Sequence, residues 1–399
     1  MDLKEQIRTL ADKYFEDIVN LRRHIHENPE LSFHEYKTSA YVKEKLNEYG
    51  IDNITEGFVK TGLLAVIEGT RETSKKTIAL RADMDALPIT ETNEVAYKSK
   101  NEGVMHACGH DIHTASLLGT ARIINNIRTE FAGRILLIFQ PGEELLPGGA
   151  KLMLEEGIFN HYRPEAVIAQ HVLPDMDAGT VGFKSGMYMA SSDEIYLTVK
   201  GKGGHAALPH LSTDTVLMAS QIIVSLQQIA SRNANPAIPT VLSFGKIEAN
   251  GATNVIPDEV KITGTFRTMN EEWRAEAHRR IEQIAQSVAY SMGGSCEVNI
   301  VKGYPFLVNN ETVTSRVRKA AEEYLGRKKV VDMDIRMTAE DFAYFTQDYP
   351  STLFRLGVKN PHTQNIKHLH TSGFDADEQA LKTSIGNLAW IAASYLNNT

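Results

Sequence analysis

The 399-residue chain has only two cysteines, Cys108 and Cys296, which are too few for a disulfide framework. It has no apolar run that approaches the ~18 residues of a membrane-spanning helix, and its charged N-terminal segment lacks the apolar core of a secretory signal. It also lacks a strongly basic segment, and 42 Lys and Arg against 50 Asp and Glu give a net charge of −8, which argues against a nucleic-acid partner. We therefore expect a soluble, cytoplasmic protein whose function resides in specific sites.

The rest of the composition is that of an ordinary globular protein, with 42% hydrophobic and 23% charged residues. Short apolar runs bounded by polar turns predict buried strands: GLLAVIEG, KTIALRADMD, RILLIFQP and EAVIAQHV. Helical segments lie between the later runs, near 114–127 and 150–156. Strands that alternate with helices predict an α/β layered domain.

A central segment, 187–304, has a different pattern. Its predicted strands and helices follow in the order β-α-β-β-α-β, which is the ferredoxin-like arrangement. The α/β character returns after this segment. We therefore predict a main α/β domain formed by 1–186 and 305–399, interrupted by a smaller inserted α+β domain.

The stretch MHACGHDIHT concentrates groups that bind metals: His106, Cys108, His110, Asp111 and His113. Cys108 and His110 can point at one centre because the glycine between them relaxes the backbone. Thiolate and imidazole together suit zinc or another borderline divalent cation. The alternative is a buried unreactive cysteine with histidines that cap a helix, which is the usual role of each residue taken singly.

A pair of carboxylates, Glu143 and Glu144, follows the apolar run RILLIFQ in the sequence FQPGEELLPGG. Active sites of α/β proteins commonly lie at this end of a strand. One carboxylate can coordinate a metal while its neighbour stays uncoordinated and accepts a proton from the hydrolytic water. A solvated acidic loop is the alternative interpretation.

Three further histidines lie outside these two motifs. His171 ends the strand EAVIAQHV, where a buried histidine is ordinarily a hydrogen-bonded core residue. His368 and His370 alternate in KHLHTSGF, and an extended segment would place both on one face. We expect at most one of these two to face a metal.

Two aspartates, Asp83 and Asp85, alternate at a strand end in LRADMDALP. A buried aspartate needs a partner, and a metal-bound histidine that it orients would supply one. A structural ion pair with Arg81 is an equal alternative.

The inserted segment contributes three polar residues at turns and strand ends: His205 in GKGGHAALPH, Asn254 in GATNVIPD and Arg267 in EVKITGTFRT. Loops and strand ends of a mobile second domain are suited to groups that close over a substrate. A turn histidine without a function is an equal alternative for His205.

Several of these motifs together resemble one known family. MHACGHDIHTA, FQPGEE, the histidine of QHVLP, GKGGHAALPH, NVIPDEVKITGTFRT, MTAEDF and the late LH segment look like the M20 metallopeptidase family. They are most similar to its amidohydrolase branch of N-acyl-amino-acid amidohydrolases, hippurate hydrolases and auxin-conjugate hydrolases. The likeness covers essentially the whole chain, beginning with LRRHIHENPELSFHEYKTS.

The resemblance implies a catalytic domain with a mixed β-sheet flanked by helices, interrupted by a ferredoxin-like lid that mediates homodimerisation. It also implies a centre of two divalent metal ions. Cysteine and histidine ligands favour zinc, and carboxylates and imidazoles also accept manganese, cobalt or nickel. Glu143 would be the general base, and the implied ligands are Cys108, His110, Glu144, His171 and His370.

The resemblance assigns roles to four more residues. Asp85 would orient a metal-bound histidine, and His205 of the partner subunit would stabilise the oxyanion. Asn254 and Arg267 would contact the carboxylate of the substrate. The sequence departs from the branch at LHTSGF, where a serine-proline usually follows the last histidine. The resemblance therefore does not predict the conformation of the turn at this point.

We therefore predict hydrolysis of the amide bond of N-acyl-L-amino acids, either hippurate-like or acetylated, by a metal-bound water. Within the same family, a dipeptidase or an N-acetyl-diaminopimelate deacetylase is the alternative. Two alternatives come from other classes: an amidase with Cys108 as nucleophile, and a metal-binding protein without catalytic activity.

Overall fold

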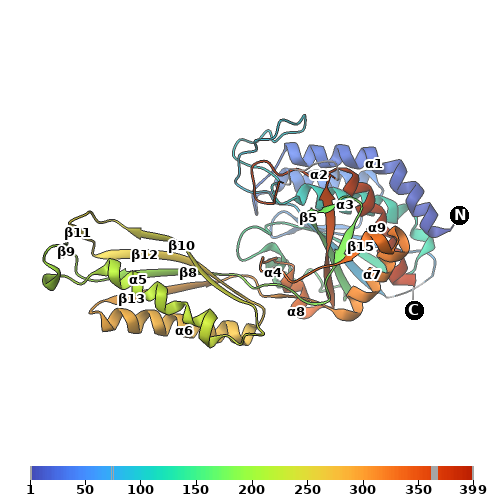
Figure 1. The fold of residues 1–399 in the computed structure, drawn as a ribbon. Coiled ribbons are helices and arrows are strands. Elements are labelled where there is room, and N and C mark those ends of the chain that lie inside the picture. The colour runs from blue at the N-terminus through green and yellow to red at the C-terminus, as the bar shows by residue number, and fades with distance from the viewer. Residues whose placement is uncertain (1, 73, 75, 361–366, 398–399) are drawn as a thin grey trace. The chain divides into compact units, whose positions relative to one another are not determined.

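The computed structural model describes the chain except for residues 1, 73, 75, 361–366 and 398–399. Within the described residues no helix is long and apolar enough to cross a membrane. The chain folds into two compact units, and each has its own sheet and hydrophobic core. Figure 1 shows the elements of both units.

The first unit consists of Met1–Gly186, Val308–Asp334 and Asp341–Thr399, and the second of Met187–Leu307 and Ile335–Glu340. This division differs from the predicted one at 305–307 and at Ile335–Glu340, which the prediction places in the main domain. The backbone of the latter segment pairs with the second unit, because Arg336 forms a β-bridge with Met189.

The first unit contains an eight-stranded mixed sheet in the order β1-β2-β4-β3-β5-β16-β6-β15. Its centre is parallel, since β4, β3, β5 and β16 run in one direction, whereas β1, β2 and β6 join by antiparallel pairs. The strands are β1 (Ile54–Phe58), β2 (Gly62–Glu68), β3 (Thr77–Asp83), β4 (Arg134–Gln140), β5 (Ala166–Asp177), β6 (Val181–Phe183), β15 (Val330–Asp332) and β16 (Ser351–Lys359). The predicted mixed α/β sheet is confirmed.

Helices cover this sheet because its central strands are apolar on both faces. Along β4, Ile135, Leu137 and Phe139 join the core formed with α1, α3 and α9, while Leu136 and Ile138 alternate with them. Figure 1 shows α4 and α8 on the other side of the sheet from α1, α3 and α9. The helices are α1 (Leu3–Glu27), α2 (Tyr36–Glu48), α3 (His110–Asn126), α4 (Gly149–Glu155), α7 (Glu311–Leu325), α8 (Ala343–Asp348) and α9 (Gln379–Asn397).

One boundary differs from the prediction in a way that matters for the site. Helix α3 begins at His110, four residues before the predicted start, so it carries the histidine that follows Gly109. Gly109 has a left-handed backbone (φ 82°), and a Cβ atom there would lie 2.6 Å from the Val172 side chain. Only glycine fits this turn, because both the φ angle and the close approach exclude a side chain.

The second unit has a four-stranded antiparallel sheet in the order β10-β12-β8-β13, with α5 and α6 packed together on it. Its chain order, β8-α5-β10-β12-α6-β13, is the predicted ferredoxin-like arrangement. A separate two-stranded sheet pairs β9 with β11. The elements are β8 (Asp193–Lys200), β9 (Gly204–His205), α5 (Thr215–Leu226), β10 (Thr240–Ala249), β11 (Val255–Ile256), β12 (Glu259–Thr268), α6 (Glu271–Ser291) and β13 (Ser295–Lys302).

Short elements complete the chain. β7 (Gly186–Met189) and β14 (Leu307–Asn309) lie where the chain passes between the units, and the remaining single turns are η1 (Arg128–Glu130), η2 (Pro209–Leu211), η3 (Ile229–Asn233) and η4 (Arg327–Lys329).

Candidate metal centre

The candidate ligands of the first unit come from four separate segments that meet at one edge of the sheet; one of them, the turn before α9, carries His370. Cys108 and His110 flank the glycine turn at the start of α3, and Glu143 and Glu144 follow β4. His171 lies on β5, next to the end of β3 in the sheet. This is the carboxyl edge of the parallel strands, where α/β sheets carry their sites.

All five predicted ligands lie close together in the structure. Cys108 Sγ is 3.5 Å from His171 Nε2 and 3.3 Å from His370 Nε2. His370 Nε2 is 3.2 Å from Glu144 Oε1, which lies 4.0 Å from His110 Nε2. The ligand atoms form two groups that share Cys108, one with His110 and His171 and the other with Glu144 and His370.

His110 is held so that one ring nitrogen faces this cluster. Its Nδ1 lies 2.9 Å from the Asp85 carbonyl oxygen and 3.2 Å from Asp85 Oδ1, and because both are acceptors, Nδ1 donates. Its Nε2 is buried without a hydrogen-bond partner. Burial lowers the pKa of His110, but the carboxylates of Asp83 and Asp85 outweigh it and raise the pKa to about 10. The metal-free ring therefore holds a proton on Nε2 at neutral pH, and a metal ion that binds there would displace this proton.

His171 is neutral and also directs Nε2 at the cluster. Its Nδ1 donates to the carbonyl oxygen of Val172 at 2.9 Å, so the lone pair is on Nε2. Burial, with a further contribution from the positive charge of Arg355, holds the pKa of His171 well below its usual value. A neutral imidazole with one nitrogen anchored in this way is the usual form of a metal ligand.

His113 uses both of its nitrogens for structure. Nδ1 donates to Asp83 Oδ1 at 2.6 Å, and Nε2 accepts the backbone N–H of Val172 at 2.9 Å. Asp83 also accepts from Arg81 at 2.5 Å. Asp83 therefore forms both of the contacts that the sequence left as alternatives, an ion pair with Arg81 and a hydrogen bond with a histidine. His113 therefore supports β5 beside the cluster and leaves no nitrogen for a metal.

The segment around His368 and His370 is a turn, and the expectation that both histidines share one face of an extended segment is wrong. His370 has a left-handed backbone (φ 60°), and its N–H donates to the Ala107 carbonyl oxygen at 2.8 Å. Thr371 Oγ1 donates to the His368 carbonyl oxygen at 2.7 Å and closes the turn. His370 thereby reaches Cys108, while the His368 side chain is 67% exposed.

The chemistry of the cluster fits a metal centre. Burial, together with Glu144 and Glu143, raises the pKa of the Cys108 thiol well above its usual value. Glu143 and Glu144 place two carboxylates beside the thiol and the imidazole nitrogens, and divalent cations are the usual counter-charge of such a donor set. Sulfur, nitrogen and oxygen donors in this proportion suit zinc and other borderline cations.

The three candidate residues of the second unit are divided between its two ends. His205 is exposed on β9, opposite Val255 of β11, and Ala206 N–H donates to the Asn254 carbonyl oxygen at 3.0 Å. Arg267 lies near the other end of β12 and donates to the Met337 carbonyl oxygen at 3.3 Å. Strand β12 has ten residues, which span roughly 30 Å at about 3.4 Å each. Asn254 and Arg267 of one chain therefore cannot contact the same carboxylate.

Two buried carboxylates beside the cluster had been assigned no role from the sequence. Glu35 accepts from Gly142 N–H at 2.9 Å, and burial together with Asp85 raises its pKa to about 7. Asp341 accepts from Arg81 at 2.8 Å, and its N–H donates to Glu143 Oε1 at 3.4 Å. Both belong to motifs that carry the resemblance, LSFHEYKTS and MTAEDF, but a sequence does not show which carboxylates become buried.

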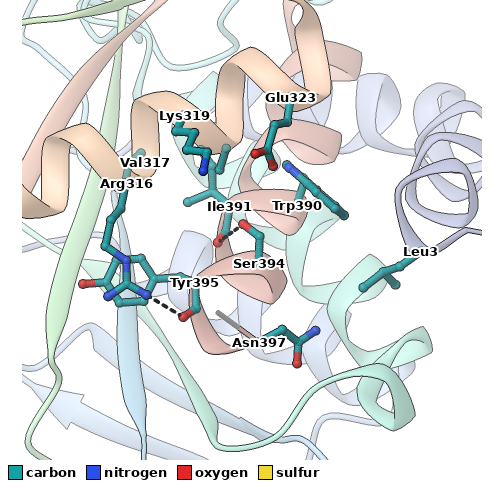
Figure 2. Close-up of a pocket in the computed structure, with 11 residues that line it drawn as sticks. Leu3, Arg316, Val317, Lys319, Glu323, Trp390, Ile391, Ser394, Tyr395 and Asn397 are labelled. Atoms are coloured by element: carbon teal, nitrogen blue, oxygen red, sulfur yellow. Dashed lines mark hydrogen bonds between the residues drawn. The ribbon is translucent and has the colours of Figure 1, made fainter. Parts of the chain in front are cut away.

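A cavity of about 530 Å³ lies elsewhere in the first unit, between α7, α9 and the start of α1 (Figure 2). The Arg316 guanidinium stacks 3.8 Å from the centre of the Tyr395 ring in its wall. None of the candidate ligands lines this cavity, so it is separate from the metal cluster.

Comparison with known proteins identifies the family of the chain. The model of peptidase family M20/M25/M40 matches residues 79–392. An N-acetyl-L-cysteine deacetylase of Bacillus subtilis is 41% identical over 91% of this chain and 84% of its own length, and thermostable carboxypeptidase 2 of Saccharolobus solfataricus is 38% identical over the full length of both chains.

A solved structure from Bacillus subtilis, described as a dinuclear metal-binding peptidase of the M20 family, has a similar fold with a TM-score of 0.82. It is 32% identical, and the match covers 97% of this chain and 99% of that one. The chain therefore belongs to peptidase family M20 and is a metal-dependent amidohydrolase.

Proposed function

We propose that this enzyme hydrolyses the amide bond between an acyl group and the nitrogen of an L-amino acid. One observation carries the proposal: five side chains whose donor atoms lie close enough to bind metal ions are clustered beside a further carboxylate, Glu143. The members of the cluster are Cys108, His110, Glu144, His171 and His370.

These five residues would hold two divalent ions, with zinc or manganese favoured by the donor set and cobalt or nickel as alternatives. When bound, such ions polarise the substrate carbonyl and lower the pKa of water. Asp85 fixes the ring of His110 through Nδ1, which is the usual function of a carboxylate behind a ligating histidine.

Glu143 is the proposed general base. Its neighbour Glu144 faces His370, whereas Glu143 receives the Asp341 N–H and lies 3.9 Å from His110. Glu143 would take a proton from the attacking water and return it to the leaving amine. Two adjacent carboxylates with different partners can thus have two different roles.

The substrate carboxylate is assigned to Arg267, whose planar guanidinium suits paired hydrogen bonds. His205 would donate to the oxyanion, and Asn254 would contact the substrate beside it. Because His205 and Asn254 lie at the opposite end of β12 from Arg267, we propose that they act in the site of a partner subunit. This division requires a homodimer.

The second unit has a surface suited to that dimer. Helix α5 buries one apolar stripe, yet its outward face exposes Val216, Leu217 and Val224 by 40%, 58% and 66%. β10 is an edge strand of the sheet, and its Ile247 is 56% exposed. Apolar patches and free strand edges are commonly covered by another chain.

A panel of acetyl, benzoyl and indole-acetyl amino acids, run with each metal in turn, tests the substrate class. We expect turnover with a free α-carboxylate in the leaving amino acid and its loss when this carboxylate is amidated. Turnover of amidated and free substrates at equal rates would contradict the role of Arg267. N-acetyl-diaminopimelate belongs in the panel as the family alternative.

A second candidate activity is removal of C-terminal amino acids from peptides, because one relative is a carboxypeptidase. A dipeptide and the matching N-acetyl amino acid share the leaving group and differ in the α-amino group. The ratio of their kcat/KM values separates a dipeptidase from an acyl-amino-acid hydrolase.

The alternative with Cys108 as nucleophile conflicts with the environment of the thiol. It leaves Glu144 and His370, which lie beside the thiol, without a role. Dialysis against a strong chelator distinguishes the two chemistries, since only the metal enzyme loses activity and regains it with a divalent ion.

A further inference from the structure

A second cluster of buried charges lies in the first unit, next to the candidate ligands and not among them. Arg22 and His26 lie one turn apart on α1, which packs along α3 (Figure 1). Arg22 Nε donates to Asp111 Oδ2 at 2.6 Å, and His26 Nδ1 lies 2.8 Å from the same oxygen. All three side chains are fully buried. Asp111 directly follows His110 at the start of α3.

The contacts of His26 define its charge. Its Nε2 lies 3.2 Å from Glu91 Oε1, and its Nδ1 faces Asp111. Carboxylates only accept hydrogen bonds, so both ring nitrogens donate and the ring is an imidazolium. Burial and Arg22, 3.3 Å away, lower the pKa of His26, but Asp111 and Glu91 outweigh them and raise it. The cluster thus pairs two buried cations with carboxylates, as buried charges require.

The same cluster reaches the segment that follows the last candidate ligand. Arg22 Nη2 donates to Asp375 Oδ1 at 2.9 Å. Asn93 Nδ2 donates both to Glu91 Oε1 at 3.0 Å and to the Phe374 carbonyl oxygen at 2.8 Å. Two side chains of α1 are therefore connected to the loop before Cys108, to the start of α3 and to the segment after His370.

We propose that Arg22 and His26 are positioning residues of the metal centre. Through Glu91, Asp111 and Asp375 they hold in register the loop before Cys108, the start of α3 and the segment after His370, so that the ligands are in place before a cation binds. Neither residue contacts the cations or the substrate. The proposal rests on the metal site proposed above.

The second unit provides a matched control. Asp193 is buried there and accepts from Arg274 Nε at 2.9 Å and from His278 Nε2 at 2.7 Å. This cluster has the same Arg–Asp–His chemistry, and none of the candidate metal ligands belongs to its unit. The variant His278→Gln therefore reports the structural effect of losing such a histidine without an effect on the metal centre.

The test titrates the metal-stripped full-length chain with Mn²⁺ and follows the EPR signal of the free ion. For His26→Gln we expect Mn²⁺ affinity to fall about 10–100-fold, the usual effect of removing a group behind a metal ligand. Arg22→Lys keeps the charge but loses the planar fork, and we expect a loss of roughly tenfold. His278→Gln should bind Mn²⁺ as the parent does. The Tm of each metal-free chain is measured alongside.

The proposal is overturned if His26→Gln and His278→Gln lose similar Tm while both bind Mn²⁺ with parental affinity. If His26→Gln does not fold, parental affinity in Arg22→Lys overturns it instead. Cys108→Ser separates this outcome from failure of the site itself. If Cys108→Ser binds as tightly as the parent, or if the parent binds no Mn²⁺, the metal-site proposal fails.

Discussion

The two units differ in how close together their candidate functional residues lie. The first unit collects residues from four distant segments into one cluster, with contacts of 3.2–4.0 Å between ligand atoms; Cys108, His110 and His171 are buried, and the His370 side chain is 55% exposed. The second unit leaves His205 exposed and separates it from Arg267 by the length of β12. The difference is what we expect if the first unit binds the metal ions by itself and the second unit contributes groups to the site of a partner chain, as proposed above.

The largest effect is expected in the first unit, at the carboxylate that we separate from the ligands. Glu143→Gln should reduce kcat by roughly 10²–10⁴-fold, because a positioned general base contributes about that much. Metal content should stay close to that of the parent, as measured by elemental analysis of the purified chain. Loss of metal from this variant would show that Glu143 is a ligand, and the two carboxylates would then no longer have different roles.

A smaller effect is expected in the second unit. His205→Ala should lower kcat by roughly 10²–10³-fold, the usual cost of removing an oxyanion donor. Mixing this variant with Glu143→Gln should restore about a quarter of parental activity. Half of randomly mixed dimers are mixed pairs, and each mixed pair has one intact site of two. No recovery despite proven exchange of subunits would place His205 in its own chain's site and break the comparison.

The smallest effect concerns stability rather than turnover. Glu35 has a pKa of about 7 in the folded chain, raised by burial and Asp85 from an ordinary value of 4.5. As the pH rises above 4.5, the unfolded chain ionises first, so stability falls until the folded carboxyl ionises near pH 7. The loss amounts to about 3 kcal/mol at most, at 1.36 kcal/mol for each unit of pKa.

Glu35→Gln should remove this loss, because an amide oxygen can still accept from Gly142 N–H and the amide N–H can donate to Thr61. Urea unfolding of the metal-stripped chain at pH 5 and pH 8 measures it. The variant should be the more stable protein at pH 8, and an equal fall in both proteins between the two pH values would contradict the prediction.

The sequence predicted the mixed α/β sheet and the ferredoxin-like unit, because strand runs and helix periodicity are local signals. The ligand set came from the resemblance to the M20 family, because the residues taken singly also allowed a buried cysteine, helix-capping histidines and an acidic loop; the structure places the five side chains close together. Whether each of them binds a metal stays a prediction that the experiments above address.

Other features depend on distances that no local pattern encodes. The turn at His370 follows from a left-handed backbone at a non-glycine residue, which alternation in KHLHTSGF does not indicate. His113 has the same type and context as a ligand, and only its contacts with Asp83 and Val172 assign it to structure. The spacing of Arg22 and His26 places them on one face of a helix, but it does not show their partners, which are distant in the sequence.

The glycine turn at the start of α3 limits how this enzyme can be redesigned. Every replacement of Gly109 must both adopt a positive φ and fit against the Val172 side chain. Libraries that aim to change metal preference should therefore vary Cys108 and His110 and keep Gly109. Another residue at the centre of the turn would change the direction of both flanking side chains at once.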